Sequence, residues 1–99
     1  MTAPLIVIAI AVAKPGRQAA LRAAQEKLVA ETLLEDGCLR YELSQSIDDD
    51  RILIFVESWE SEAKWRAHMD GAAIRRFQAS GVGDHFADFA LHRTTKVAG

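Results

Sequence analysis

The sequence predicts an α+β fold in which two helices cover one face of an antiparallel sheet. Two stretches repeat apolar residues at helical spacing, and four others are rich in the β-branched and aromatic residues typical of strands. They follow one another in the order strand, helix, strand, strand, helix, strand. Because 99 residues fit one domain, residues 1–99 are expected to form a single unit.

The first strand and the first helix are predicted from their apolar patterns. Residues 5–12 contain isoleucine and valine at both alternating positions, which is typical of a strand covered on both faces. A Lys-Pro-Gly segment at residues 14–16 ends this strand. An amphipathic helix is then expected over residues 17–34, and its apolar side carries Leu21, Ala24 and Leu28.

A β-hairpin is predicted after the first helix. The second strand alternates polar side chains with the apolar residues Leu39, Tyr41, Leu43 and Ile47. Three aspartates at residues 48–50 are expected to form a turn. A calcium-binding loop is not expected there, because the segment lacks the glycine and the distal glutamate of such a loop. The third strand is expected over residues 52–59.

The second helix and the last strand complete the predicted fold. Ser61 is a predicted N-cap. One face of the following helix is expected to carry Trp65, His68, Met69 and Ala72, and Ile74 and Phe77 continue this apolar cover. A glycine-containing loop at residues 81–84 then leads to a strand over residues 86–97.

This order of elements is the split βαβ, or ferredoxin-like, arrangement. Two helices can cover only one face of such a sheet, yet the first strand and residues 53–56 of the third are apolar on both faces. The uncovered apolar face therefore needs a partner that shields it from water. A second copy of the same sheet would serve, so we expect a homodimer with an isologous interface.

Composition and charge exclude several classes of protein. A hydrophobic share of 49% and a charged share of 26% are typical of folded soluble domains. The net charge is −2, and the arginines are interspersed with acidic residues, so nucleic acid is not an expected partner. Cys38 is the single cysteine, which permits no intrachain disulfide and favours a cytoplasmic location.

The apolar segment at residues 5–13, LIVIAIAVA, could be mistaken for a targeting segment. It ends in Ala11-Val12-Ala13, which resembles a signal-peptide cleavage site. No lysine or arginine precedes it, and it is far shorter than the roughly 20 residues of a membrane span. We therefore expect a buried strand rather than a signal peptide or a membrane anchor.

Glu57 and Trp59 are the first candidate site residues, because residues two apart in a strand share a face. If Ile47 opposed Ile52, Arg40 and Glu42 would join that face, whereas a shift of one residue would bring Tyr41 there instead. A carboxylate among aromatic rings has a raised pKa and can act as a base, unless Arg40 stabilises its charge. The alternative is a Glu57 that is partly solvated or paired with an arginine.

His68 is the second candidate, since it lies on the predicted apolar side of the second helix, facing the sheet. An imidazole there can exchange a proton near neutral pH, although a hydrogen-bonded core histidine is the alternative. His85 and His92 form no short-spaced pair with other ligands, so no metal site is expected. Cys38 is expected to be an inert thiol, and no glycine-rich phosphate motif or nucleophile elbow is present.

Four segments resemble the antibiotic biosynthesis monooxygenase (ABM) domain family in order and spacing. They are DGCLRYEL at residues 36–43, FVESWES at 55–61, AHM at 67–69 and RRF at 75–77. The resemblance implies a ferredoxin-like fold that pairs into a dimeric α+β barrel, with a pocket between sheet and helices. It also implies oxygenation of a small aromatic quinol or anthrone-like polyketide by O2, without flavin, haem or metal as cofactor.

The same resemblance implies roles for individual residues. His68 or Glu57 would handle the proton and Trp59 would line the site, so these three are the expected catalytic residues. The expected substrate-binding residues are Tyr41, Trp65, Met69, Phe77 and Arg40.

The chain departs from the family pattern at two places. Many members carry a second histidine where this chain has Ala73, and haem-degrading relatives use an asparagine on the first strand, where residues 2–14 contain none. Haem breakdown is therefore disfavoured. A non-catalytic dimeric domain that binds a small molecule, or an isomerase of a small carbonyl metabolite, are the alternative functions.

Overall fold

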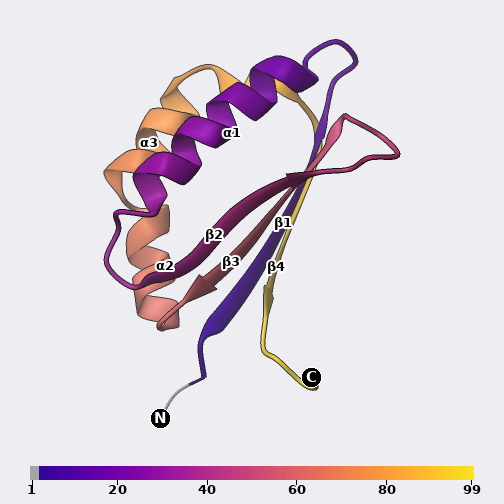
Figure 1. Ribbon diagram of the computed structural model, residues 1–99. Helices are drawn as coiled ribbons and strands as arrows, with labels where there is room; N and C mark the ends of the chain where they lie inside the picture. The colour runs from indigo at the N-terminus through magenta and orange to yellow at the C-terminus, as the bar shows by residue number, and fades with distance from the viewer. Residues whose placement is uncertain (1–2) are drawn as a thin grey trace.

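Helices and strands form two layers in the computed structural model, which describes residues 3–99 (Figure 1). The elements are β1 (Leu5–Ala13), α1 (Gln18–Thr32), β2 (Cys38–Gln45), β3 (Ile52–Trp59), α2 (Glu62–Met69), α3 (Ala72–Ala79), the 3₁₀ helix η1 (Val82–His85) and β4 (Phe86–Thr94). The predicted α+β class and the order of the strands and helices are confirmed.

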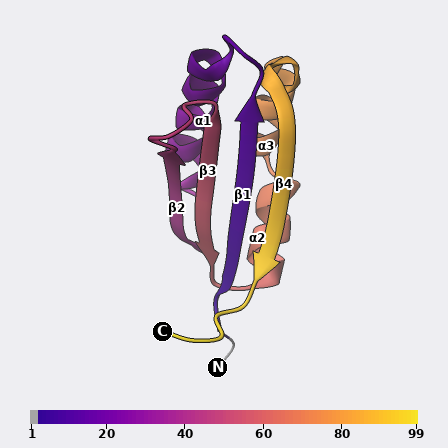
Figure 2. The ribbon, with the colours of Figure 1, turned by 90° about the vertical axis from the view of Figure 1, so that its right-hand side faces the viewer.

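The four strands form one antiparallel sheet in the order β2-β3-β1-β4. Figure 2 shows that all three α-helices lie behind this sheet, with α1 behind β2 and β3 and with α2 and α3 toward β4. This is the predicted ferredoxin-like arrangement. The helices leave the other face of the sheet uncovered, as their number required.

β1 is apolar on both faces, and each face has its own surroundings. Val7, Ala9, Ala11 and Ala13 are buried beneath the helices. The alternate residues are half-buried on the opposite side, where all but Ile6 pair with apolar residues of β3. We call this second surface the open face; it comprises Ile6, Ile8, Ile10, Val12, Ile52, Ile54 and Val56.

The pairing of β2 with β3 contains one irregularity. Cys38 opposes Trp59 and Arg40 opposes Ser58, so Leu39 is an extra residue on β2. Beyond it, Tyr41 lies opposite Glu57. Of the two registers that the sequence allowed, this is the one that brings Tyr41 to the Glu57 side.

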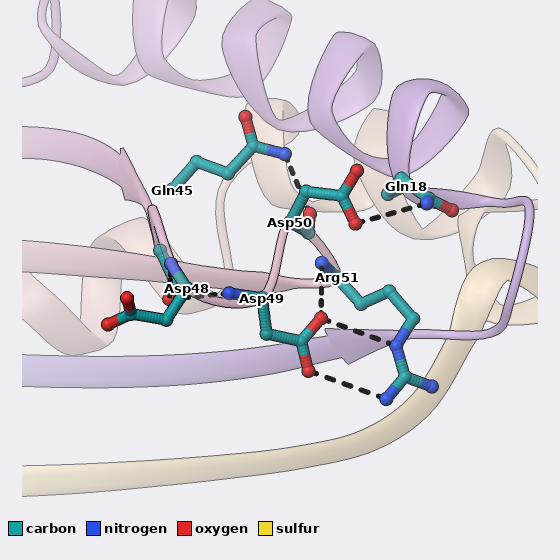
Figure 3. Close-up of polar contacts among 7 residues, drawn as sticks. Gln18, Gln45, Asp48, Asp49, Asp50 and Arg51 are labelled. Atoms are coloured by element: carbon teal, nitrogen blue, oxygen red, sulfur yellow. Dashed lines mark hydrogen bonds and ion pairs between the residues drawn. The ribbon is translucent and has the colours of Figure 1, made fainter.

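The β2–β3 connection is longer than predicted. Ile47 does not belong to β2 but lies in the turn, where it is 99% exposed. The three aspartates form a turn as predicted, because backbone N–H groups of Asp48 and Asp49 donate to Ser46 and the Asp49 carboxylate accepts from Arg51 (Figure 3). Gln18 of α1 donates to Asp50, which links the turn to the helix layer.

The second helical region is divided where one continuous cover was predicted. Ser61 caps α2 as expected, since its Oγ accepts from the backbone N–H of Lys64 at 3.2 Å. α2 ends at Met69, and Gly71 then adopts an extended conformation (ψ 173°) before α3 begins. Ala72, predicted on the apolar face, is therefore exposed at the start of α3. The break allows α3 to follow a different direction from α2 (Figure 1).

The helix-covered face of the sheet contains two packed clusters. One surrounds Tyr41, Phe55 and Trp59, and the other surrounds Leu21 and Leu53. No helix within residues 3–99 is both long and apolar enough to cross a membrane.

Candidate active site

A cavity of about 470 Å³ lies between the helix-covered face of the sheet and the helices. Most of its wall is apolar, with contributions from Leu28, Phe55, Ile74, Phe77, Phe86 and Leu91. Four buried polar side chains also line it, namely Gln25, Tyr41, Glu57 and His68. Its volume falls in the range of pockets that bind small molecules.

The sheet register places Tyr41 and Glu57 side by side in this wall. The two residues are direct cross-strand partners on the helix-covered face. Both are buried, and only 4% of Glu57 is exposed. The register is set at the β2–β3 turn, because the pairing runs without a shift from Gln45–Leu53 to Tyr41–Glu57, and the extra residue Leu39 lies beyond it.

Glu57 holds a carboxyl group in apolar surroundings. Burial raises its pKa from 4.5 to about 7, and the hydrogen bond from Trp59 opposes this rise. In that bond, Trp59 Nε1 donates to Glu57 Oε1 at 2.9 Å. Glu57 therefore exchanges a proton near neutral pH, as expected for a general acid or base.

His68 faces the cavity from α2 and is 3% exposed. Its Nδ1 lies 2.6 Å from Oε1 of Glu35, which follows α1 and reaches solvent. Burial lowers the pKa of His68, while the Glu35 carboxylate opposes this change. With Nδ1–H donated to Glu35, Nε2 carries the lone pair and is the nitrogen available to a ligand.

The loop that carries Glu35 is held by a backbone feature that requires glycine. Gly37 has φ +81°, and a Cβ at this position would lie 2.5 Å from the side chain of Lys64. Lys64 also pairs with Asp36 in the same loop. The loop is thus fixed against α2, the helix that carries His68.

Aromatic rings surround the imidazole of His68. The Trp59 ring lies 4.7 Å from it at 31°, and the Tyr41 ring lies 5.4 Å away in an edge orientation. Burial, followed by the charge of Glu57, raises the pKa of Tyr41, so its hydroxyl stays a neutral hydrogen-bond donor. The group can bind a phenol, accept its proton and keep water from the resulting anion.

The structure brings together most of the residues that the sequence singled out. Tyr41, Glu57, His68, Met69 and Phe77 line the cavity. Trp59 is fully buried behind Glu57 and His68 and does not line it. Its indole donates a hydrogen bond to Glu57 and packs against the His68 ring.

Two other candidates lie elsewhere. Trp65 is buried on α2 with Arg93 5.5 Å from its ring, and it is not part of the cavity wall. Arg40 points to the opposite side of the sheet from Glu57, where its exposed side chain pairs with Glu42 at 2.7 Å. The Arg40 guanidinium therefore does not stabilise the Glu57 carboxylate.

Sequence patterns missed Glu35 and Gln25. Glu35 carried no signal, because its partner His68 lies in a different element. Gln25 carried one: it stands at helical spacing from both Leu21 and Leu28, on the side where only apolar residues were expected. Gln25 is fully buried there, whereas Ala24, predicted for that side, is half-buried.

The other residues considered from the sequence have no nucleophilic or metal-binding feature in the part of the chain that the structure describes. Burial, followed by the charges of Glu35 and Glu57, raises the pKa of the Cys38 thiol, which disfavours its nucleophilic form. Within residues 3–99 there is no group of three or more His, Cys, Asp or Glu side chains that could hold a metal ion. Ala73 is buried in the core and does not line the cavity.

Comparison with known families gives a match over most of the chain. The family model described as "Antibiotic biosynthesis monooxygenase" (ABM) matches residues 4–80. A Mycobacterium tuberculosis protein named "Putative monooxygenase Rv0793" is 38% identical over 55 residues. That alignment covers 56% of this chain and 54% of the relative, so it spans about half the length of the relative.

Solved structures extend the similarity to the whole fold. PA3566 from Pseudomonas aeruginosa has a TM-score of 0.92 and 30% identity, with 99% of this chain and 98% of that chain covered. The structure of Rv0793 has a TM-score of 0.88 and 26% identity, with 98% of each chain covered. The elements that position the cavity are therefore shared with these proteins.

Proposed function

We propose that this protein, which belongs to the antibiotic biosynthesis monooxygenase family, oxygenates a small aromatic quinol or anthrone-like polyketide without flavin, haem or metal. Family membership and the relative named "Putative monooxygenase Rv0793" support monooxygenase chemistry. One observation supports the substrate class. Tyr41, Glu57 and His68 gather at one end of a cavity that is otherwise largely apolar, which suits a flat aromatic molecule with a hydroxyl at its end.

The reaction needs no electron source other than the substrate. Loss of a proton to a base gives an electron-rich anion, which passes one electron to O2 and combines with it to form a carbon-bound peroxide. Return of the proton gives a hydroperoxide. Loss of the remaining hydrogen from the peroxide-bearing carbon and cleavage of the O–O bond then leave a new C=O group and release water. One oxygen atom thus enters the product, the other becomes water, and both reducing equivalents come from the substrate.

In the proposed reaction, three residues of the cavity wall divide these tasks. His68 accepts the substrate proton at Nε2, because its Nδ1 is held by Glu35. Tyr41 donates a hydrogen bond to the anion that forms. Glu57, with a pKa of about 7, exchanges the proton that the peroxide takes up.

A homodimer is part of the proposal. The open face presents seven isoleucine and valine side chains in adjacent rows on β1 and β3. Figure 2 shows that no helix covers these strands on this side of the sheet. A contiguous apolar surface of this kind favours association, and the same face of a second copy would match it in shape and polarity. Two sheets packed in this way would form an α+β barrel with one cavity in each subunit.

Ligand binding without turnover is the second candidate function. It is favoured by Ala73, where many members of the family are expected to carry a second histidine. A site that lacks one proton-transfer group could still bind the same aromatic ligands through its apolar wall. Binding and turnover must therefore be measured separately.

Oxygen uptake by the purified protein tests the proposal. We would measure uptake with hydroquinones, naphthoquinols and anthrones, and subtract the rate of autoxidation without protein. The native protein should exceed autoxidation with at least one of them, and His68→Asn should lower the excess by roughly 10²- to 10⁴-fold, the usual contribution of a general base. His85→Asn is the matched control, because His85 contacts Arg17 and does not line the cavity.

Three other outcomes would contradict the proposal. Binding of the panel without uptake would favour the ligand-binding function. Conversion of a bound ligand in the absence of oxygen would favour isomerisation. Equal oxygen uptake by the native protein and His68→Asn would show that His68 is not the base.

A further inference from the structure

Gln25 is a polar residue on the wall of the cavity that the proposed chemistry does not use. It is 1% exposed, and its Oε1 has no hydrogen-bond partner among residues 3–99. Leu21 and Leu28, its neighbours on the same side of α1, are both buried and apolar. The amide of Gln25 is therefore buried between two apolar neighbours on α1.

An amide oxygen without a partner destabilises a folded protein. Burial without a hydrogen bond costs about 1–3 kcal/mol, so such atoms are rare in native structures and call for an explanation. A leucine at residue 25 would avoid this penalty. The Oε1 atom is enclosed here, and a turn about the soft terminal bond of the side chain would present it to the cavity, where a ligand could supply its partner.

The position of Gln25 along the cavity indicates which part of a ligand it would meet. Leu28 packs in the cluster around Tyr41, and Leu21 packs in the other cluster, around Leu53. At 1.5 Å per residue, Gln25 lies roughly 5 Å along α1 from each of these leucines. It therefore stands between the two ends of the cavity.

The sheet gives the length over which the cavity extends. Glu57 pairs with Val7 and Phe89 pairs with Ala11, and both Glu57 and Phe89 line the cavity. Four residues along β1 correspond to roughly 13 Å. A ring system that starts at Glu57 must be longer than a single ring to fill this space, and it would pass Gln25 on the way.

We propose that Gln25 is a specificity-determining residue whose amide hydrogen-bonds a second hydroxyl, carried on a different ring from the one that faces His68 and Glu57. The ligand class is then a fused aromatic compound of two or three rings with oxygen substituents on two of them. This inference rests on the proposed function for the place of the first hydroxyl. A site built for a hydroxyl discriminates against the analogue that lacks it, because the protein group is left unpaired.

Binding under nitrogen tests this inference without turnover. We would measure dissociation constants by calorimetry for 1-naphthol, 2-naphthol and the 1,5-, 2,6- and 2,7-dihydroxynaphthalenes, which carry their hydroxyls on different rings. At least one diol should bind the native protein about tenfold more tightly than the corresponding naphthol, the effect of one buried hydrogen bond. In Gln25→Leu this advantage should fall to less than about twofold, while the naphthols bind as before.

Gln18→Leu is the matched control, because Gln18 lies on the same helix but does not line the cavity. It should keep the tenfold advantage of the diol. Gln25→Leu should melt at or above the native temperature, since it removes an unpaired acceptor, so a weaker diol complex cannot be attributed to unfolding.

Three results would overturn the role of Gln25. They are an equal advantage of the diol in Gln25→Leu, no advantage in the native protein, and no binding of any naphthol or diol. Failure of this role and failure of the proposed function can be told apart. If a diol bound through Gln25 but its complex consumed no oxygen in air, the proposed monooxygenase function would be wrong and the role of Gln25 in binding would stand.

Discussion

The Nδ1 atom of His68 lies 2.6 Å from Oε1 of Glu35, although the two residues stand 33 positions apart in the chain. This contact fixes the orientation of the imidazole and leaves Nε2 free to act in the cavity. It also connects a buried base with a carboxylate that reaches solvent. A proton taken from a substrate can thus be stabilised by a negative charge behind the ring, as in acid–histidine pairs of other enzymes.

Glu35→Gln should change the pH dependence of turnover. The Glu35 carboxylate raises the pKa of His68, so its removal should lower that pKa further. The acidic limb of the pH–rate profile should therefore move to lower pH. The rate at neutral pH should fall roughly 10- to 100-fold, because the imidazole becomes a weaker and less well oriented base.

Glu31→Gln is the control for this change. Glu31 is a carboxylate of similar exposure, 25% against 24% for Glu35, but it pairs with Arg76 outside the cavity. Its replacement should leave the pH–rate profile unchanged. If Glu35→Gln lowered the rate without moving the acidic limb, Glu35 would have only a structural role.

Glu57→Gln should alter how stability depends on pH. The pKa of Glu57 is about 7 in the folded protein, against an ordinary value of 4.5, so between these values the folded state retains a proton that the unfolded state loses. Native stability therefore falls as pH rises through this window. Glutamine keeps the Oε1 acceptor for Trp59 but has no charge to desolvate.

The variant should thus gain stability over the native protein by up to about 3 kcal/mol between pH 4.5 and pH 8. Urea unfolding at both pH values measures this gain. Taking the difference between the two proteins removes the separate effect of His68, whose lowered pKa makes acid destabilising. A difference between variant and native that is the same at both pH values would show that Glu57 ionises normally.

Trp59→Phe should raise the pKa of Glu57 above about 7, because the indole N–H stabilises the carboxylate. The carboxyl carbon signal of Glu57 in NMR titrations would report this change. Trp65→Phe removes an indole that makes no hydrogen bond with Glu57 and should leave the titration in place. An unaltered Glu57 titration in Trp59→Phe would mean that the indole does not affect the pKa of Glu57.

Ile54→Lys should convert the proposed homodimer into a monomer. The substitution places a charge in the centre of the open face, where association would bury it without a partner. Sedimentation analysis measures the mass in solution. Ile47→Lys is the matched control, since Ile47 is almost fully exposed in the β2–β3 turn. A native protein that sediments as a monomer would contradict the dimer outright.

Local patterns were sufficient to predict most of the fold. Residues 52–59 were predicted as a strand and form β3, and Ser61 was predicted as the cap of α2, because alternation and capping depend on nearby residues alone. The break at Gly71 was not predicted, since Ile74 and Phe77 continue the apolar pattern across it. A helical period alone does not show that the axis changes direction.

The site could be predicted only in part, for a related reason. Glu57 and Trp59 share a face in any register, whereas the face of Tyr41 depends on the β2–β3 turn, which sets Ser46 rather than Ile47 opposite Ile52. The contact between Glu35 and His68 arises from the packing of a loop on a helix. No spacing within one element reveals such a contact.

Isotope labelling of the product is the most direct test of oxygenation at this site. The protein would be incubated with the best substrate of the oxygen-uptake panel under ¹⁸O2, and the product analysed by mass spectrometry before exchange with water. The account predicts one ¹⁸O atom in each product molecule, and product formation that falls at least about a hundredfold in His68→Asn. A product without ¹⁸O, formed equally well by both proteins, would contradict it.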